Sequence, residues 1–116
     1  MGEKRHPTFD EVWDRVRALE GAHIPLAERG EIDVIKVDQR GLVRRTSQGQ
    51  LARMSIESFR WAVTELNRRQ QMDRIEILEG IRRWESSGVV AILAATGLFE
   101  ITRGTRVGLR VMSSDG

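Results

Sequence analysis

Cysteine and tyrosine are absent from this chain of 116 residues, and only two residues, Lys4 and Lys36, are lysines. Without cysteine there is no disulfide, no thiol nucleophile and no thiolate metal ligand. The two histidines, His6 and His23, provide little material for a metal cluster or for a His-paired nucleophile. No apolar stretch reaches the roughly 18 residues of a membrane-spanning helix, and the N-terminal residues lack an apolar signal segment. These absences predict a non-catalytic, cofactor-free protein of the cytoplasm that does not enter a membrane.

Charges of the two signs nearly balance, because 19 basic residues face 17 acidic ones and leave a formal net charge of +2. The sequence pI of about 9.9 overstates the basic character, since almost nothing in the chain titrates between neutral pH and about pH 10. The distribution is uneven: residues 1–38 carry 6 basic and 9 acidic groups, whereas residues 39–116 carry 13 and 8. The surplus of arginine in residues 40–69 predicts an anionic partner.

The pattern of apolar residues predicts an α+β fold with a single domain over residues 8–112. A helix is expected over residues 8–20, where apolar side chains recur at helical spacing after a capping box at Thr8. Short apolar runs separated by turn residues then predict an antiparallel meander of three or four strands. These strands are expected at residues 22–26, 32–37, 42–45 and 51–54. Residues 1–7 and 113–116 are expected to be disordered.

Three further helices and a β-hairpin are expected in the second half of the chain. Ser55 is placed to cap the first of these helices, and a capping box at Asp73 opens the next, which is expected to bury Trp84. A short fourth helix is expected to begin at Ser86 or Ser87, to run through Thr96 and to end before Gly97. Alternation around a Thr-Arg-Gly-Thr turn predicts a hairpin with strands at residues 99–101 and 107–111.

This final sequence of helix, tight turn, short helix and hairpin resembles a winged helix, a variant of the helix-turn-helix in which a hairpin flanks the recognition helix. The resemblance covers about a third of the chain and rests on the order of its elements. It implies DNA binding, with Arg, Lys, Asn or Gln of the second helix reading base edges in the major groove. The corresponding residues 88–96 contain no such side chain. If the domain binds DNA, we therefore expect the hairpin tip, with Arg103, Thr105 and Arg106, to contact phosphate or the minor groove instead. An ordinary hairpin that closes the core is the alternative interpretation.

The sequence thus favours a nucleic-acid-binding accessory protein that uses arginine contacts to phosphate. On the meander, alternation places Arg44 and Arg45 on opposite faces of the sheet. Scattered, solvated arginines are the alternative explanation of the basic cluster. Apart from the hairpin tip, the expected contacts are Arg40, Arg45, Arg53, Arg60, Arg68 and Arg69.

A protein interaction module, homodimeric or otherwise homo-oligomeric and without nucleic-acid binding, is the competing hypothesis. Trp61 lies off the apolar stripe of its helix, so it is either half-buried against a neighbouring element or part of a partner surface. The apolar segment 88–99 is the other candidate contact.

A metal-dependent nuclease is a poor fit to the acidic strand that begins at Glu31. Strand alternation places Glu31 and Asp33 on one face and Lys36 on the other, and no Glu-x-Lys follows to complete a metal site. These residues are therefore interpreted as solvated strand charges.

Overall fold

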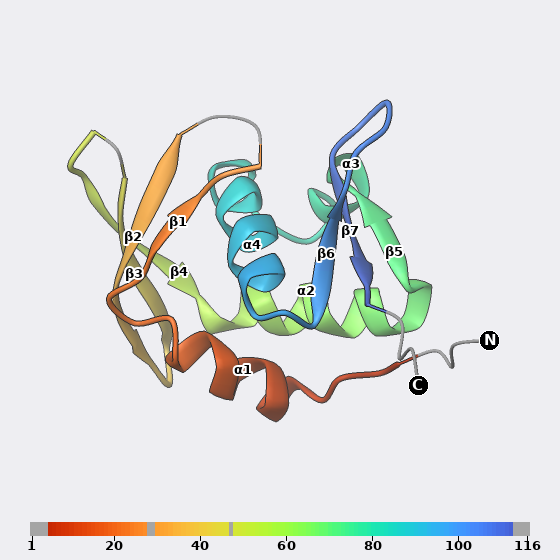
Figure 1. Cartoon of the computed structure of the whole chain (residues 1–116), viewed down its shortest axis with the longest axis horizontal. Coiled ribbons are helices and arrows are strands. Elements are labelled where there is room, and N and C mark those ends of the chain that lie inside the picture. The colour runs from red at the N-terminus through yellow and green to blue at the C-terminus, as the bar shows by residue number, and fades with distance from the viewer. Residues whose placement is uncertain (1–4, 28–29, 47, 113–116) are drawn as a thin grey trace.

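The structure, a computed structural model, describes residues 5–27, 30–46 and 48–112. Over these ranges the chain is an α+β domain in which two antiparallel sheets lie on either side of helix α4 (Arg83–Ala95). Helices α1 (Phe9–Arg17) and α2 (Ile56–Arg69) run along the base of this assembly (Figure 1). The predicted fold class is confirmed.

The first sheet is the predicted meander, and it has four strands. Its strands β1 (His23–Pro25), β2 (Glu31–Asp38), β3 (Gly41–Thr46) and β4 (Leu51–Ser55) pair in chain order. The turn between β2 and β3 depends on Gly41, which has a φ of +145° and where a Cβ atom would overlap the carbonyl oxygen of Met54.

Strand β2 contains a β-bulge that changes which face its charged residues occupy. Val34 pairs with Arg44 and Lys36 pairs with Val43, so Ile35 is an extra residue without a counterpart on β3. Asp33 lies opposite Arg45, and Lys36 lies opposite Val43. Arg45 and Val43 are two residues apart on β3, so their side chains share one face of the sheet. Asp33 and Lys36 therefore both lie on the solvent face. The expectation that Lys36 faces away from Asp33 is therefore wrong.

The second sheet contains one strand that the sequence did not reveal. Strand β5 (Gln71–Asp73) follows α2 directly, because Gln70 adopts a left-handed conformation with φ 68° and turns the chain. The predicted hairpin, β6 (Phe99–Thr102) and β7 (Gly108–Val111), then pairs through β7 with β5, in the order β5-β7-β6.

Two helix boundaries and the orientation of Trp84 differ from the predictions. The helix that opens at Asp73 is only α3 (Arg74–Ile77), and α4 begins at Arg83 rather than at residue 86. Trp84 is 46% exposed instead of buried. Its neighbour Glu85 takes the inward position in the first turn of α4, and consecutive helical residues point about 100° apart.

The core is centred on α4, whose residues from Val89 to Leu93 are all buried. A helix that is apolar on all sides needs cover on all sides. Both sheets and helix α1 contact α4, and α2 contributes to the same core. Buried residues from these elements are Ile32, Val34, Leu42, Met54, Phe59, Val63, Leu66, Phe99, Leu109 and Val111. None of the helices in the described part of the chain is both long enough and apolar enough to cross a bilayer.

The N-terminal segment can be followed from Arg5, while residues 1–4 and 113–116 lie outside the described residues. Pro7 is buried, and its carbonyl oxygen accepts a hydrogen bond of 2.8 Å from the Asn67 side chain of α2. The Gln70 side chain donates to the carbonyl oxygen of Arg5 at 3.0 Å. Both contacts lie within the segment that was expected to be disordered.

We expect Gly80→Ala to lower the free energy of unfolding by about 1–3 kcal/mol, because a Cβ atom at this position would overlap the indole ring of Trp61. Gly104→Ala is the matched control, since its Cβ meets no atom within 4 Å. Urea denaturation of the two variants measures the difference. Equal midpoints would show that the Trp61 ring moves aside without cost.

Candidate nucleic-acid interface

Arg68 and Arg69, at the end of α2, are held by acidic neighbours. Glu65 lies 2.6 Å from Arg68 Nη2 and 2.9 Å from Arg69 Nη2, and Arg69 Nη1 also lies 3.2 Å from Glu76. Hydrogen bonds from Arg68, followed by Arg69, lower the pKa of Glu65, although desolvation of this carboxyl opposes them. These two arginines therefore carry little uncompensated charge.

Arg60 and Arg53 also have partners within the fold. The Arg60 guanidinium lies 4.4 Å from the centroid of the Phe9 ring, and its Nε atom is 3.6 Å from Glu57. Arg53 Nη1 is 3.1 Å from Asp38, and this hydrogen bond is the main reason why the pKa of Asp38 is lowered. Both arginines are exposed but neutralised locally.

The predicted alternation of Arg44 and Arg45 is confirmed, since Arg44 is buried and Arg45 is exposed. Arg45 lies opposite Asp33 in the sheet and lines a small cavity with Asp33 and Glu31. Its surroundings are therefore acidic, which is unfavourable for binding phosphate.

The arginines expected from the sequence thus occupy separate parts of the molecule. The structure brings Arg40 and Arg53 together, because both line the same two cavities beside the β2–β3 turn. It places Arg103 and Arg106 together on the β6–β7 hairpin. Arg45, Arg60, Arg68 and Arg69 each lie among their own acidic or aromatic neighbours.

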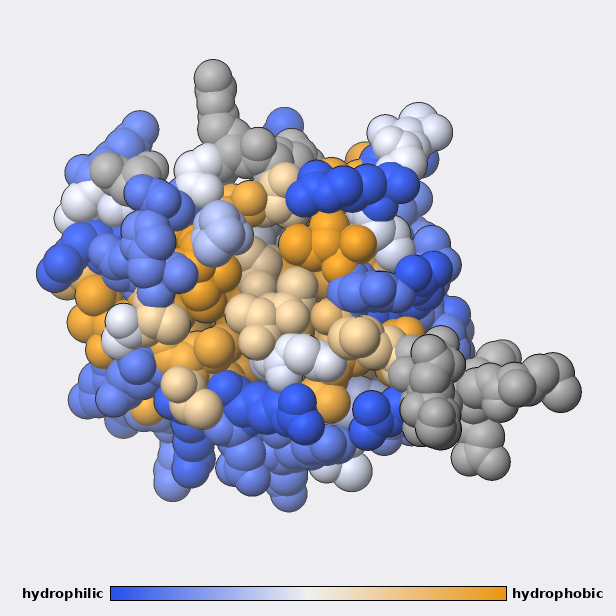
Figure 2. Space-filling view, in the orientation of Figure 1, coloured by the Kyte–Doolittle hydropathy of each residue, from blue (hydrophilic) through white to orange (hydrophobic). Residues whose placement is uncertain are grey.

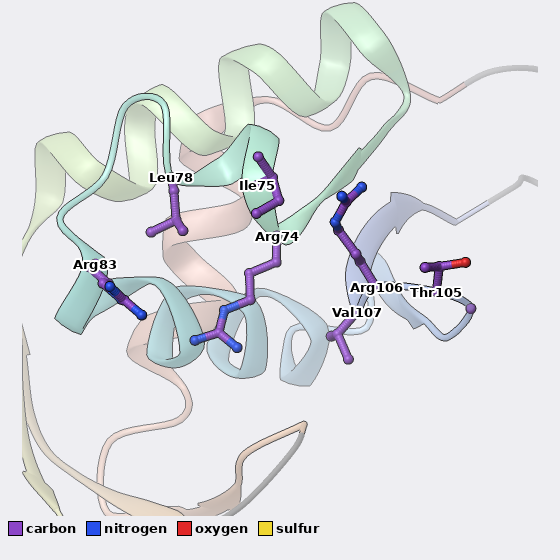
Figure 3. A pocket seen from close by; sticks show the side chains of 8 residues that line it. Arg74, Ile75, Leu78, Arg83, Thr105, Arg106 and Val107 are labelled. Atoms are coloured by element: carbon purple, nitrogen blue, oxygen red, sulfur yellow. The ribbon is translucent and has the colours of Figure 1, made fainter.

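Arg106 belongs instead to a second basic site, the hairpin groove, which has a volume of about 690 Å³. In Figure 3 Arg83, at the start of α4, and Arg74, at the start of α3, extend toward one another, with Arg106 on the hairpin side. Apolar side chains form the rest of the groove, and one of them, Ile75, is 54% exposed. The groove is lined by Arg74, Ile75, Leu78, Arg83, Gly104, Thr105, Arg106 and Val107.

The charges around the hairpin groove are predominantly positive. Arg106 Nη1 lies 3.7 Å from Asp73, and Arg83 forms no side-chain bond with any residue that the structure describes. Arg103 reaches away from the groove, where its Nη1 donates to the carbonyl oxygen of Ala27 at 3.1 Å. Sequence reasoning missed Arg74 and Arg83. The winged-helix order could have indicated them, because both residues open helices that precede the hairpin.

Trp61 and segment 88–99, the two candidate partner surfaces of the interaction hypothesis, mostly pack against other residues of the same chain. Trp61 is half-buried, and its ring lies against Gly80. In the apolar segment 88–99, most residues pack between the two sheets, whereas Ala95 and Gly97 are exposed. The apolar character of this segment is therefore explained without a second copy.

His23 is held between two carboxylates on the solvent face of the first sheet. Its Nδ1 atom is 2.6 Å from Asp33, and its Nε2 atom is 2.7 Å from Glu31. The hydrogen bond to Asp33, followed by that to Glu31, raises the pKa of His23. Among the described residues no group of three His, Cys, Asp or Glu side chains is arranged to hold a metal ion. The arrangement therefore joins β1 to β2.

The raised pKa of His23 predicts a pH-dependent contribution to stability. A group whose pKa is higher in the folded state stabilises that state fully below its unfolded value of about 6.5, and the contribution is lost as the pH rises through the folded value. Urea unfolding of wild type and His23→Gln between pH 5.5 and 9 should give a difference that shrinks with rising pH. A difference that stays constant over this range would contradict the assignment.

Comparison with known proteins assigns no family: no family model, no curated protein and no solved structure matches this chain.

Proposed function

We propose that this protein binds duplex nucleic acid through the hairpin groove, in the manner of a winged helix and without catalysis. The observation that carries the proposal is the arrangement of α2, β5, α3, α4, β6 and β7, in which β7 lies between β5 and β6. This arrangement contains the helix, turn, helix and hairpin on which the winged-helix resemblance rests, and it sets the tip of the hairpin beside the start of α4. Arginines occupy both sides of the groove.

Guanidinium groups in this arrangement suit a phosphate backbone. Arginine offers several donors in a rigid fork and remains charged at all physiological pH values. Arg83 and Arg106 lie on two elements that border one groove, so they are placed to contact neighbouring phosphates. The apolar side chains of Ile75 and Val107 supply a surface for the sugars between them.

Readout of bases by α4 is not part of this proposal. In a winged helix the recognition helix enters the major groove, but residues 88–93 of α4 are buried between the sheets. The first turn of α4 and the hairpin tip remain accessible. We therefore infer binding that depends mainly on the backbone and varies little with sequence.

We expect a short blunt-ended DNA duplex to bind with an affinity that falls steeply between about 50 and 200 mM salt. Arg83→Ala and Arg106→Ala should each weaken binding and each lower the slope of log K against log salt by about one, as expected for the loss of one phosphate contact. Fluorescence anisotropy with a labelled duplex measures both quantities.

The matched control is Arg68→Ala, which removes the same charge from a residue paired with Glu65. It should leave the affinity close to that of wild type. Equal losses in all three variants would point to a general charge effect, and the absence of binding at the lower salt would refute the proposal.

Homo-oligomerisation is the second candidate, and one observation favours it. Figure 2 shows an apolar tract on the face between the two sheets, surrounded by hydrophilic residues. Half-buried Ala94 of α4 and Ile101 of β6 belong to elements on this face, and half-buried Leu26 directly follows β1. Light scattering of the anisotropy samples decides this point, because self-association gives a mass that rises with protein concentration. Either role is consistent with a place in the cytoplasm.

A further inference from the structure

Another basic site, which we name the tryptophan cavity, also adjoins the start of α4. Its volume is about 430 Å³. Trp84, at 46% exposure, is the most exposed of the three tryptophans, since Trp13 is 4% exposed and Trp61 is half-buried. The cavity is lined by Arg40, Arg53, Ser55, Ser58, Gly80, Arg82, Trp84 and Glu85.

The buried side chain of Arg44 packs against Trp84 and holds it in place. The buried Arg44 guanidinium lies 5.5 Å from the ring centroid and donates to the carbonyl oxygen of Trp84 at 3.0 Å. The neighbouring Glu85 is 3% exposed and accepts hydrogen bonds from the Ser55 amide at 3.2 Å and from Ser58 Oγ at 3.0 Å. A large aromatic surface is therefore presented to solvent on a rigid base.

The charge around this ring is positive and partly uncompensated. No described residue forms a side-chain bond with the guanidinium of Arg40 or Arg82. The adjoining cavity shares Arg40 and Arg53 and adds Arg17 and Lys36, the residue that the bulge in β2 turns to this face. The acidic groups are Asp38, which pairs with Arg53, Glu20, whose Oε1 accepts from the Val37 amide, and the buried Glu85. An exposed ring surrounded by arginines favours an anionic partner with a flat aromatic part.

The tryptophan cavity is adjacent to the hairpin groove. Arg82 lines the cavity and Arg83 lines the groove, and consecutive Cα atoms are only about 3.8 Å apart. A strand that leaves a duplex bound in the groove therefore meets Trp84 within a short distance.

We propose that the tryptophan cavity binds an unpaired nucleotide of a single-stranded extension next to the duplex, with its base stacked on Trp84 and its phosphate on Arg40 and Arg82. The volume lies within the range of about 300–1,000 Å³ that small-ligand sites occupy. This inference rests on the proposed duplex binding and specifies its substrate as a duplex with an unpaired end.

Three DNA probes test the inference: a blunt duplex, the same duplex with a short thymidine extension, and the same duplex with an abasic extension of equal length. The abasic extension keeps the phosphates and lacks the bases. Wild type should bind the thymidine extension about fivefold to a hundredfold more tightly than the abasic one, as expected for stacking of one base on an aromatic ring. Intrinsic tryptophan fluorescence should be quenched by the thymidine extension alone.

Two variants separate stacking from folding. Trp84→Leu should abolish the preference for thymidine over abasic extensions while the affinity for the blunt duplex stays unchanged. Trp84→Phe keeps an aromatic face and should keep most of the preference, although the quenching is lost. Circular dichroism melting of both variants identifies any loss of structure.

Each outcome bears on one proposal at a time. Equal binding of thymidine and abasic extensions by wild type would overturn this inference and leave duplex binding intact. Failure of the blunt duplex to bind would overturn duplex binding. Oligothymidine and an abasic oligonucleotide without a duplex would then test the cavity alone, and equal binding of those two strands would overturn it as well.

Discussion

The burial of α4 on all sides is the constraint on which the rest of this structure depends. An apolar helix of this kind is not stable at a surface, so it is covered by two sheets. The four strands of the first sheet precede α4 in the sequence. In the second sheet β5 precedes α4, and β6 and β7 follow it. Truncating one of its central residues, such as Ile92, to alanine costs about 2–5 kcal/mol in cores of this type. Both candidate sites lie at the start of this helix, where it emerges from between the sheets.

Hydrogen bonds of buried polar side chains join α4 to the first sheet: Arg44 Nη2 donates to the carbonyl oxygen of Trp84, and Glu85 accepts from the Ser55 amide. Arg44 of β3 and Glu85 of α4 are both buried, and burial lowers the pKa of Arg44 while the charge of Glu85 opposes this effect. Gly88 leaves room for the Arg44 guanidinium, because a Cβ atom there would come within 2.7 Å of Nη1. The need to satisfy Arg44 and Glu85 sets the rotation of the first turn, and that rotation leaves Trp84 exposed.

Local patterns predicted most of the fold and little of the site. Helix caps depend only on neighbouring residues, and the caps at Thr8, Ser55 and Asp73 are present. Alternation of apolar and polar side chains is also a local pattern, and the meander and hairpin strands that it predicts are present. Strand β5 was not predicted because three residues are too few to show an alternation of apolar and polar side chains. The bulge at Ile35 and the outward position of Trp84 depend on tertiary pairing. Arginine density pointed to residues 40–69. Which of these arginines remain unpaired depends both on local pairs, such as Arg68 with Glu65, and on contacts distant in sequence, such as Arg53 with Asp38.

The placement of α4 also shapes what kind of recognition this arrangement supports. The helix that would read base edges is committed to the core, so the binding that we propose uses contacts with phosphates at the hairpin groove and with one base at Trp84. Phosphate contacts supply affinity without sequence information, and stacking on an aromatic ring accepts every base. Selectivity then has to come from the shape of the nucleic acid. Under the two proposals, a duplex that ends in an unpaired strand would fill both sites and a continuous duplex would fill only the groove. The two surfaces together would then favour ends and junctions over any particular sequence.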